Sequence, residues 1–218
     1  MDLYISPHPD DAILSCGGRL IKEDGPKTIL NIFSGNYKGE TGWDKLCGLK
    51  GEPMKTRIKE DKKQLKKVGV VGIYLDFYDQ AAYDDIFKKE PPTDRRDQVG
   101  KKIREVIATL SPRRVFCPYG IGHPDHKLVS RAVKSISKNP VFYEDFPYSM
   151  KKSLSGGKVF KFSRGILDKK MDLILGYESQ LKGFFELTET KTVEEFISKT
   201  KEHHLRSGNI GESYLIEK

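Results

Sequence analysis

Residues 3–22 read LYISPHPDDAILSCGGRLIK, and this stretch decides the fold class. The apolar run at 3–5 predicts a short strand that ends at Ser6-Pro7. The apolar spacing over 11–22 predicts a helix that follows directly. A polar turn of histidine, proline and aspartate joins the two, so the chain opens with a strand–helix unit.

The alternation of strand and helix continues along the chain. Further strands are predicted at 27–33, 70–77, 114–117, 141–143, 158–162 and 212–216, and further helices at 53–67, 97–110, 126–137, 168–185 and 193–205. The stretch 34–51 is polar, rich in glycine and without a period, which predicts a long loop. Helices between successive strands imply crossover connections. We therefore expect an α/β fold with a mostly parallel, doubly wound sheet and helices on both faces, and residues 1–218 as a single domain.

The composition is that of a folded protein. The 218 residues hold 39 Lys+Arg against 31 Asp+Glu, a net charge of +8, and 37% of them are hydrophobic, which excludes general disorder. No apolar run of about 18 residues is present and the first strand starts at once, so we expect neither a membrane span nor a secretory signal. Cys16, Cys47 and Cys117 are odd in number and far apart, which favours a reducing, cytoplasmic location.

The positive charge raises an alternative function, a non-enzymatic basic module that binds nucleic acid or an acidic polymer. The lysines, however, come in scattered pairs such as Lys62-Lys63 and Lys101-Lys102, inside helical stretches that also contain acidic residues. This pattern is typical of solvated helix faces. We therefore expect no nucleic-acid partner, although an anionic substrate stays open.

Three of the five histidines lie in two short motifs that each follow a predicted strand. The motifs are His8-Pro9-Asp10-Asp11 and His123-Pro124-Asp125-His126. In doubly wound sheets ligands bind at the carboxyl ends of the strands, and imidazole and carboxylate are ligands for a divalent metal. Helix capping by one aspartate in each motif is an alternative, with Asp125 capping a helix that starts near His126. Capping leaves the second aspartate and the histidines unexplained, so the two motifs together favour a metal site.

The two motifs, with Cys16-Gly17-Gly18 after the first, resemble the LmbE-like and PIG-L superfamily of de-N-acetylases, zinc hydrolases with a Rossmann-like fold. The resemblance implies metal ligands at His8, Asp11 and His126. It also implies a zinc-dependent N-deacetylase, which hydrolyses the linear amide of a small N-acetylglucosamine-type conjugate. Another divalent cation such as Fe²⁺ is compatible with these ligands.

Asp10 and His123 are the candidate catalytic residues. Three protein ligands leave a coordination position for water, and Asp10, next to the ligand Asp11, is the candidate general base that takes a proton from that water. His123 in its protonated form is the candidate donor to the developing oxyanion. Asp125 is a candidate to orient one of the imidazoles.

By the same resemblance Arg57 and Asp79 are candidate substrate-binding residues, although a surface position explains either of them equally well. The chain departs from the family at Ala12, where members often have an acidic residue. It departs again at Ile121, where some members have a tyrosine that assists the oxyanion, and Tyr119 is the nearest substitute.

Aromatic and basic residues of the long loop, Tyr37, Trp43 and Lys45, are expected with residues 143–149 to shape the mouth of the site. An aromatic ring there can stack on a sugar or simply pack in the core. His203 and His204, late in a charged helix, are predicted to lie on the surface.

A second enzymatic alternative uses the same residues. His8-x-Asp10 with a distant histidine matches the 2-His-1-carboxylate pattern of non-haem Fe(II) enzymes, in which Asp10 rather than Asp11 is the ligand. The βα alternation is not typical of those enzymes. The sequence fixes neither the sugar nor the oligomeric state, and a homo-oligomer is compatible with it.

Overall fold

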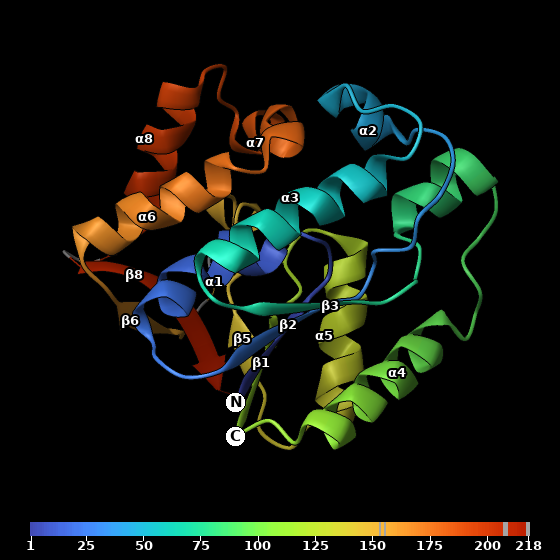
Figure 1. The fold of residues 1–218 in the computed structure, drawn as a ribbon, viewed down its shortest axis with the longest axis horizontal. Helices are drawn as coiled ribbons and strands as arrows, with labels where there is room; N and C mark the ends of the chain where they lie inside the picture. Colours follow the sequence, from blue (N-terminus) through green and yellow to red (C-terminus); the bar gives the residue numbers. More distant parts are fainter. Residues whose placement is uncertain (153, 155, 207–208, 217–218) are drawn as a thin grey trace.

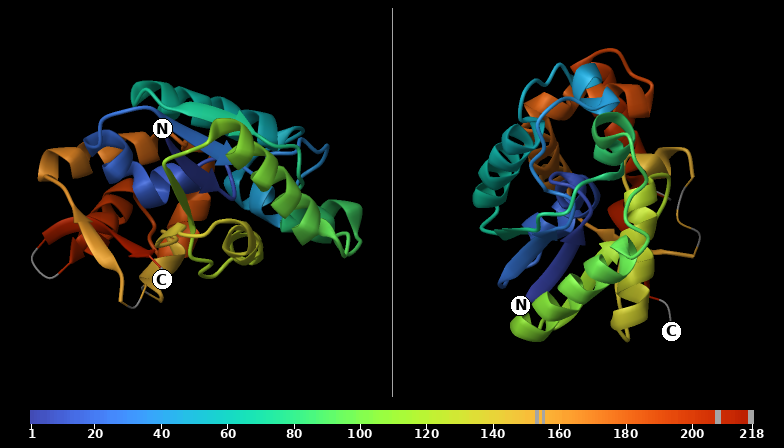
Figure 2. Two further views of the ribbon diagram at one scale, coloured as in Figure 1. Left: turned by 90° about the horizontal axis from the view of Figure 1, so that it is seen from below. Right: turned by 90° about the vertical axis from the view of Figure 1, so that its right-hand side faces the viewer.

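A computed structural model describes residues 1–152, 154, 156–206 and 209–216 as a sheet with helices on both faces (Figures 1 and 2). The strands are β1 (Asp2–Ser6), β2 (Lys27–Asn31), β3 (Val71–Tyr74), β4 (Arg114–Pro118), β5 (Val141–Tyr143), β6 (Lys158–Lys161), β7 (Leu205–Arg206) and β8 (Asn209–Ile216). The α-helices are α1 (Asp11–Lys22), α2 (Gly42–Cys47), α3 (Pro53–Lys67), α4 (Arg95–Leu110), α5 (Pro124–Ile136), α6 (Arg164–Leu175), α7 (Leu181–Thr188) and α8 (Val193–His203). Three short turns of other helix types are η1 (Ala82–Phe87), η2 (Tyr148–Met150) and η3 (Glu178–Gln180). None of the helices in the described part of the chain is long and apolar enough to cross a membrane.

The strand order confirms the predicted fold class. The sheet runs β3-β2-β1-β4-β5-β8-β6, with β7 paired to β8. The neighbours from β3 to β5 are parallel, whereas β8 is antiparallel to both β5 and β6. The first strand therefore lies inside the sheet, and the carboxyl ends of β1, β4 and β5 share one edge.

Alternation along β1 explains why both faces of the sheet are covered. Tyr4 packs into a core with residues of α1, α6, α7 and α8, whereas Leu3 and Ile5 pack into a second core with residues of α4 and α5. All three side chains are fully buried. A strand buried on both faces is expected in a parallel sheet with crossover helices.

One predicted helix is wrong: residues 168–185 do not form a continuous helix. The helix α6 ends at Leu175, and α7 starts at Leu181 after η3. The reason lies at Gly176, where a Cβ atom would be 2.4 Å from Cδ of Gln64. The close approach of α3 stops α6 at this glycine, and apolar periodicity does not report such a contact.

The loop predicted at 34–51 contains a short helix, α2. Thr41 caps it through a hydrogen bond from the Asp44 backbone N–H to Thr41 Oγ1, at 3.1 Å, and Asp44 Oδ2 accepts from the Thr41 backbone N–H at 2.9 Å. This reciprocal capping box is visible in the sequence as Thr-x-x-Asp. The pattern is therefore a signal that the prediction overlooked.

The helix predicted at 126–137 starts two residues earlier, and this corrects the role of Asp125 as its cap. Pro124 occupies the first turn, where proline is favoured, and His123 is the N-cap residue, whose Nδ1 accepts the Asp125 backbone N–H at 3.2 Å. The carboxylate of Asp125 is therefore available for other partners.

The prediction that His203 and His204 lie on the surface is wrong for His204. This residue is buried, and its Nε2 lies 2.6 Å from Nζ of the fully buried Lys170. Lys170 also forms an ion pair with Glu212 at 2.7 Å. The pairing stabilises a buried lysine, which joins α6 to β8.

Candidate active site

The turn between β1 and α1 presents the first histidine motif. Ser6 Oγ donates a hydrogen bond to the His8 carbonyl at 2.7 Å and accepts the Ala12 backbone N–H at 3.1 Å, which closes the turn. Asp10 has a φ of 129°, a conformation that an aspartate rarely adopts. Ala12 packs into the core.

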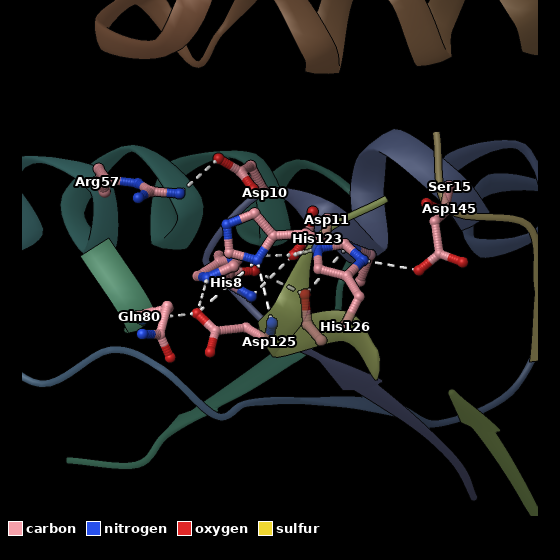
Figure 3. Close-up of polar contacts among 12 residues, drawn as sticks. His8, Asp10, Asp11, Ser15, Arg57, Gln80, His123, Asp125, His126 and Asp145 are labelled. Carbon is pink, nitrogen blue, oxygen red and sulfur yellow. Dashed lines mark hydrogen bonds and ion pairs between the residues drawn. The ribbon is translucent and has the colours of Figure 1, made fainter. Parts of the chain in front are cut away.

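Asp11 lies between His8 of the first motif and His126 of the second (Figure 3). Its Oδ2 atom is 3.1 Å from His8 Nδ1 and 3.1 Å from His126 Nε2, and it also accepts the His8 backbone N–H at 2.8 Å. All three side chains are buried. The two strand-end motifs, more than a hundred positions apart in sequence, therefore meet at one carboxylate.

Each of these two imidazoles uses its other ring nitrogen to contact a second buried carboxylate. His8 Nε2 is 3.2 Å from Asp125 Oδ2, and His126 Nδ1 is 2.7 Å from Asp145 Oδ1 (Figure 3). Metal-binding histidines are typically oriented by such outer carboxylates. The structure therefore gives Asp125 the orienting contact that the sequence suggested.

Sequence reasoning missed Asp145. This residue is fully buried, and its second oxygen accepts the backbone N–H groups of Gly120 and Ile121 at 2.9 and 3.1 Å. It thus fixes both His126 and the loop that leads to it. A signal existed, since Asp145 follows β5 by two residues, at the same sheet edge as the two motifs.

The residues present fit a divalent metal. His126 Nε2 is buried and lacks a hydrogen-bond partner among the described residues, because its contact with Asp11 does not have hydrogen-bond alignment. Ligand atoms of His8, His123 and His126 also lie within 4.8 Å of one another. Nitrogen and carboxylate donors at this spacing suit zinc or a similar cation.

The electrostatics of the site are set by burial and by close ion pairing. Burial alone would lower the pKa of both imidazoles, but contacts with Asp11 and the outer carboxylates raise it to about 9 for His8 and about 10 for His126. Burial raises the pKa of Asp11, yet His126 and His8 together hold it well below its usual range. The central carboxylate is therefore ionised.

Asp10 lies outside this cluster, beside Arg57. Arg57 Nη2 is 3.0 Å from Asp10 Oδ2, and both side chains are buried (Figure 3). Burial raises the pKa of Asp10 to about 7, although the charge of Arg57 opposes the shift. A carboxylate with a pKa near neutrality is suited to exchange protons with a substrate.

His123 does not have the charge that the sequence analysis expected. Burial, followed by the charges of His8 and His126, lowers the pKa of His123 to about 3, so the ring is neutral rather than protonated. Because Nδ1 accepts the Asp125 backbone N–H, the neutral ring carries its proton on Nε2. The neutral ring of His123 therefore still has one N–H group, on Nε2, that can donate a hydrogen bond.

A cavity of about 240 Å³ opens onto these residues. Its polar lining comprises His8, Asp10, Asp11, Arg57, Asp79 and His123, and its apolar lining comprises Leu14, Trp43, Ala81, Pro147, Tyr148, Phe184 and Leu187. A larger cavity of about 510 Å³ lies elsewhere, near the C-terminal ends of α1 and α3, and has no histidine in its lining. We therefore assign the candidate site to the smaller of these two cavities, because histidines of both motifs line it.

Arg57 and Asp79 do not lie at the surface, which was the alternative left open by the sequence. Both are buried and both line the cavity, and Asp79 Oδ1 accepts the Ala82 backbone N–H at 2.8 Å. Of the expected mouth residues, Trp43, Pro147 and Tyr148 line it, whereas Tyr37 is buried and donates its hydroxyl to Asp44 at 3.0 Å.

From the sequence, Tyr119 is the candidate for the oxyanion-assisting tyrosine, because Ile121 occupies the usual position. The structure does not support this role for Tyr119. Tyr119 is 37% exposed and packs its ring against Phe142, outside the cavity. Tyr148, one of the expected mouth residues, has its ring centre 5.2 Å from that of His126 and 6.0 Å from that of His123. Tyr148 is therefore the tyrosine nearest to the candidate oxyanion donor.

Comparison with known proteins gives a family match and several similar proteins. The family model PIG-L, described as GlcNAc-PI de-N-acetylase, matches residues 3–137. A 2'-N-acetylparomamine deacetylase of Streptomyces fradiae is 26% identical over 94% of this chain and 78% of its own length. A probable N-acetyl-alpha-D-glucosaminyl L-malate deacetylase 2 of Bacillus cereus is 30% identical over 63% of this chain and 61% of its own. The crystal structure of the zinc inhibited form of a teicoplanin deacetylase superimposes with a TM-score of 0.83 at 21% identity, covering 99% of this chain and 97% of that one, and so shares the fold.

Proposed function

Because the chain belongs to the PIG-L family of de-N-acetylases, we propose that it removes the N-acetyl group from an amino-sugar conjugate of the N-acetylglucosamine type. The observation that carries the proposal is the contact of His8 and His126 with the single carboxylate of Asp11, with Asp10 on the wall of the same cavity. The relatives named as deacetylases of N-acetylated sugars support it.

The proposed ligands of the metal are His8 through Nδ1, Asp11 through its carboxylate, and His126 through Nε2. Zinc is the proposed cation, since two imidazoles and a carboxylate are a ligand set of catalytic zinc sites. When bound, zinc supplies Lewis acidity toward the amide and lowers the pKa of water toward neutrality. The outer contacts of His8 with Asp125 and of His126 with Asp145 keep the two donor nitrogens turned toward Asp11.

Asp10 is the proposed general base. Its carboxylate takes a proton from the attacking water as the oxygen bonds to the acyl carbon, and it returns the proton to the amine nitrogen as the C–N bond breaks. The products are acetate and a free amine. Arg57, 3.0 Å away, holds the carboxylate on the cavity wall during both transfers.

His123 is proposed to stabilise the oxyanion as a neutral donor. The Nε2–H of its ring donates to the carbonyl oxygen while that oxygen gains negative charge. Capping of α5 by Nδ1 sets the ring orientation, because the Asp125 backbone N–H occupies that nitrogen.

The contacts of the two aspartates favour the hydrolase over the iron alternative. A 2-His-1-carboxylate site would use Asp10, yet Asp10 pairs with Arg57 and it is Asp11 that both imidazoles contact. For the basic-module alternative, one lysine of a pair on α4 is engaged within the helix, because Lys102 Nζ lies 3.1 Å from Glu105 Oε2.

Two aspartate substitutions test the proposal. We expect Asp10→Asn to retain bound zinc but to lose at least about a hundredfold in turnover, the size of a general-base contribution. Asp11→Ala should lose both zinc and activity. The measurements are zinc content by atomic emission and release of primary amine from a panel of N-acetylated sugars.

Asp24→Asn, a change at an exposed aspartate, is the matched control and should behave as the parent. An Asp10→Asn protein as active as the parent would contradict the assignment of the base. Iron-dependent oxygen consumption without release of amine would contradict the whole proposal.

A further inference from the structure

Trp43 is the only tryptophan of the chain, and it lines the cavity that holds His8, Asp10 and Asp11. It is partly exposed rather than buried, and it contributes to the lining of the cavity. The mechanism proposed above makes no use of it. An aromatic residue in this position therefore calls for a role of its own.

The indole is fixed by two contacts with the segment that carries α7. Its Nε1–H donates to Oε1 of the fully buried Gln180 at 2.7 Å. Its six-membered ring lies against Gly183, where a Cβ atom would be only 2.2 Å from Trp43 Cζ2. The ring thus fits a hollow that exists only because residue 183 has no side chain.

The helix α2 that carries Trp43 is itself anchored, although it has only six residues. Its capping box is reinforced by Tyr37, whose hydroxyl donates to Asp44 Oδ2 at 3.0 Å. The Gly42 backbone N–H donates to Asp85 Oδ2 at 2.6 Å, which ties α2 to η1. The indole is therefore presented as a preorganised surface and does not depend on closure of a loop.

We propose that the fixed indole of Trp43 is the surface on which the sugar ring of the substrate stacks, so that Trp43 determines specificity for amides carried on a ring. The inference rests on the proposed function. A pyranose presents a face of C–H groups, which packs on an aromatic ring, while its hydroxyl groups need polar partners. The cavity offers both, with Trp43, Phe184 and Leu187 in its apolar lining and Arg57 and Asp79 in its polar lining.

The first test uses the single tryptophan as a fluorescent reporter. Excitation at a wavelength that spares tyrosine should give an emission that glucosamine changes in a saturable way in the wild-type protein. Ethanolamine, which carries the same amine without a ring, should leave the emission unchanged at equal concentration. Emission that responds equally to both amines, or to neither, would overturn the proposal.

The second test separates binding from chemistry. Trp43→Ala should raise KM for an N-acetylated sugar by roughly fivefold to tenfold, the worth of an aromatic contact, with kcat within about twofold of the parent. Gly183→Ala should raise KM in the same way, because its methyl group displaces the indole. Gly165→Ala, at an exposed glycine whose Cβ would meet no atom closer than Ser163 Oγ at 3.9 Å, is the matched control and should keep the parent's KM.

The outcomes distinguish a failure of the proposed function from a failure of the role proposed for Trp43. If the wild-type protein hydrolyses no N-acetylated sugar, the proposed function fails. If it hydrolyses one and both variants keep the parent's KM, only the role of Trp43 fails. A purely structural role would lower the melting temperature of Trp43→Ala without raising KM, and that result also counts against the proposal.

Discussion

Arg95 contacts none of the proposed ligands, yet it fixes the carboxylate that orients one of them. Its Nη2 atom donates to Asp125 Oδ1 at 2.8 Å and to the Tyr78 carbonyl at 2.7 Å, and it is buried over the ring of Phe33. Asp125 in turn contacts His8. Arg95 therefore acts on the metal centre through two intermediaries, as a positioning residue.

Arg95→Gln should weaken zinc binding by roughly tenfold to a hundredfold, which is the usual effect of losing an outer partner of a metal ligand. Competition with a chromophoric chelator measures this affinity directly, without turnover. Arg96→Gln, at the exposed neighbouring position, serves as the control. Equal affinities in the two variants would remove Arg95 from the account of the site.

For single residues, the sequence reveals the two histidine motifs but not the side chains that contact them. His8, Asp11 and His126 are recognisable because histidine is rare in this chain and stands close to aspartate in two motifs that each follow a strand. Arg95 is not recognisable, because it is one of many basic residues in a charged stretch, and only the fold brings it to Asp125. The neutral state of His123 was equally hidden, since it results from burial beside two other imidazoles.

At the scale of elements, a buried carboxylate joins α3 to the neighbouring strands and to the break after α6. Asp61 accepts hydrogen bonds from the hydroxyls of Tyr74 at 2.6 Å and Tyr177 at 2.7 Å, and from Asn31 at 3.2 Å. Burial raises the pKa of Asp61, and the tyrosine hydroxyls limit the rise. Folding stability therefore depends on these donors.

Tyr177→Phe should lower the free energy of unfolding by about 1–3 kcal/mol at pH 7, because a charged buried acceptor loses a donor. A raised pKa of a carboxyl group in the folded state costs stability above that pKa, and the cost disappears below the ordinary value of 3.8. The difference between variant and parent should therefore shrink as the pH falls toward 4.

Urea unfolding at several pH values checks this dependence on pH. Tyr119→Phe removes a hydroxyl from an exposed residue and should match the parent throughout. A loss of stability in Tyr177→Phe that does not vary with pH would point to packing rather than to the ionised carboxylate.

Periodicity and terminators predicted most elements, and α3 begins and ends at the expected residues, Pro53 and Lys67. Prediction failed where one element's shape depends on another. The break at Gly176 follows from contact with Gln64, and the start of α5 follows from capping by a histidine, a residue not usually counted as a cap. These are tertiary effects, which local patterns do not contain.

At the scale of the whole molecule, the candidate metal centre connects segments that the chain keeps far apart. Asp11 belongs to α1, His126 to α5, and Asp145 to the segment after β5. A cation bound at this point would bind the folded state alone, since the unfolded chain does not hold these residues together. Binding would then add its free energy to that of folding.

Removal of the metal should therefore lower the melting temperature of the wild-type protein by about 10 °C. This value assumes a free cation concentration about a thousandfold above Kd, and it applies to a chain of this length. Calorimetry with and without a chelator measures the shift. Asp11→Ala should show no shift on chelation. A parent protein with one melting temperature under both conditions would argue against a cation in this cluster.

The segments that carry the proposed reaction differ from those that shape the apolar part of the cavity. The turn before α1 and the start of α5 carry the ionisable groups, whereas α2 and α7 supply Trp43, Phe184 and Leu187. Mutations can therefore accumulate in α2 and α7 without disturbing the hydrolytic groups. Such an architecture is evolvable: the same catalytic groups can be directed to a new acceptor by changes at the cavity residues of these two segments, and it is equally open to redesign in the laboratory.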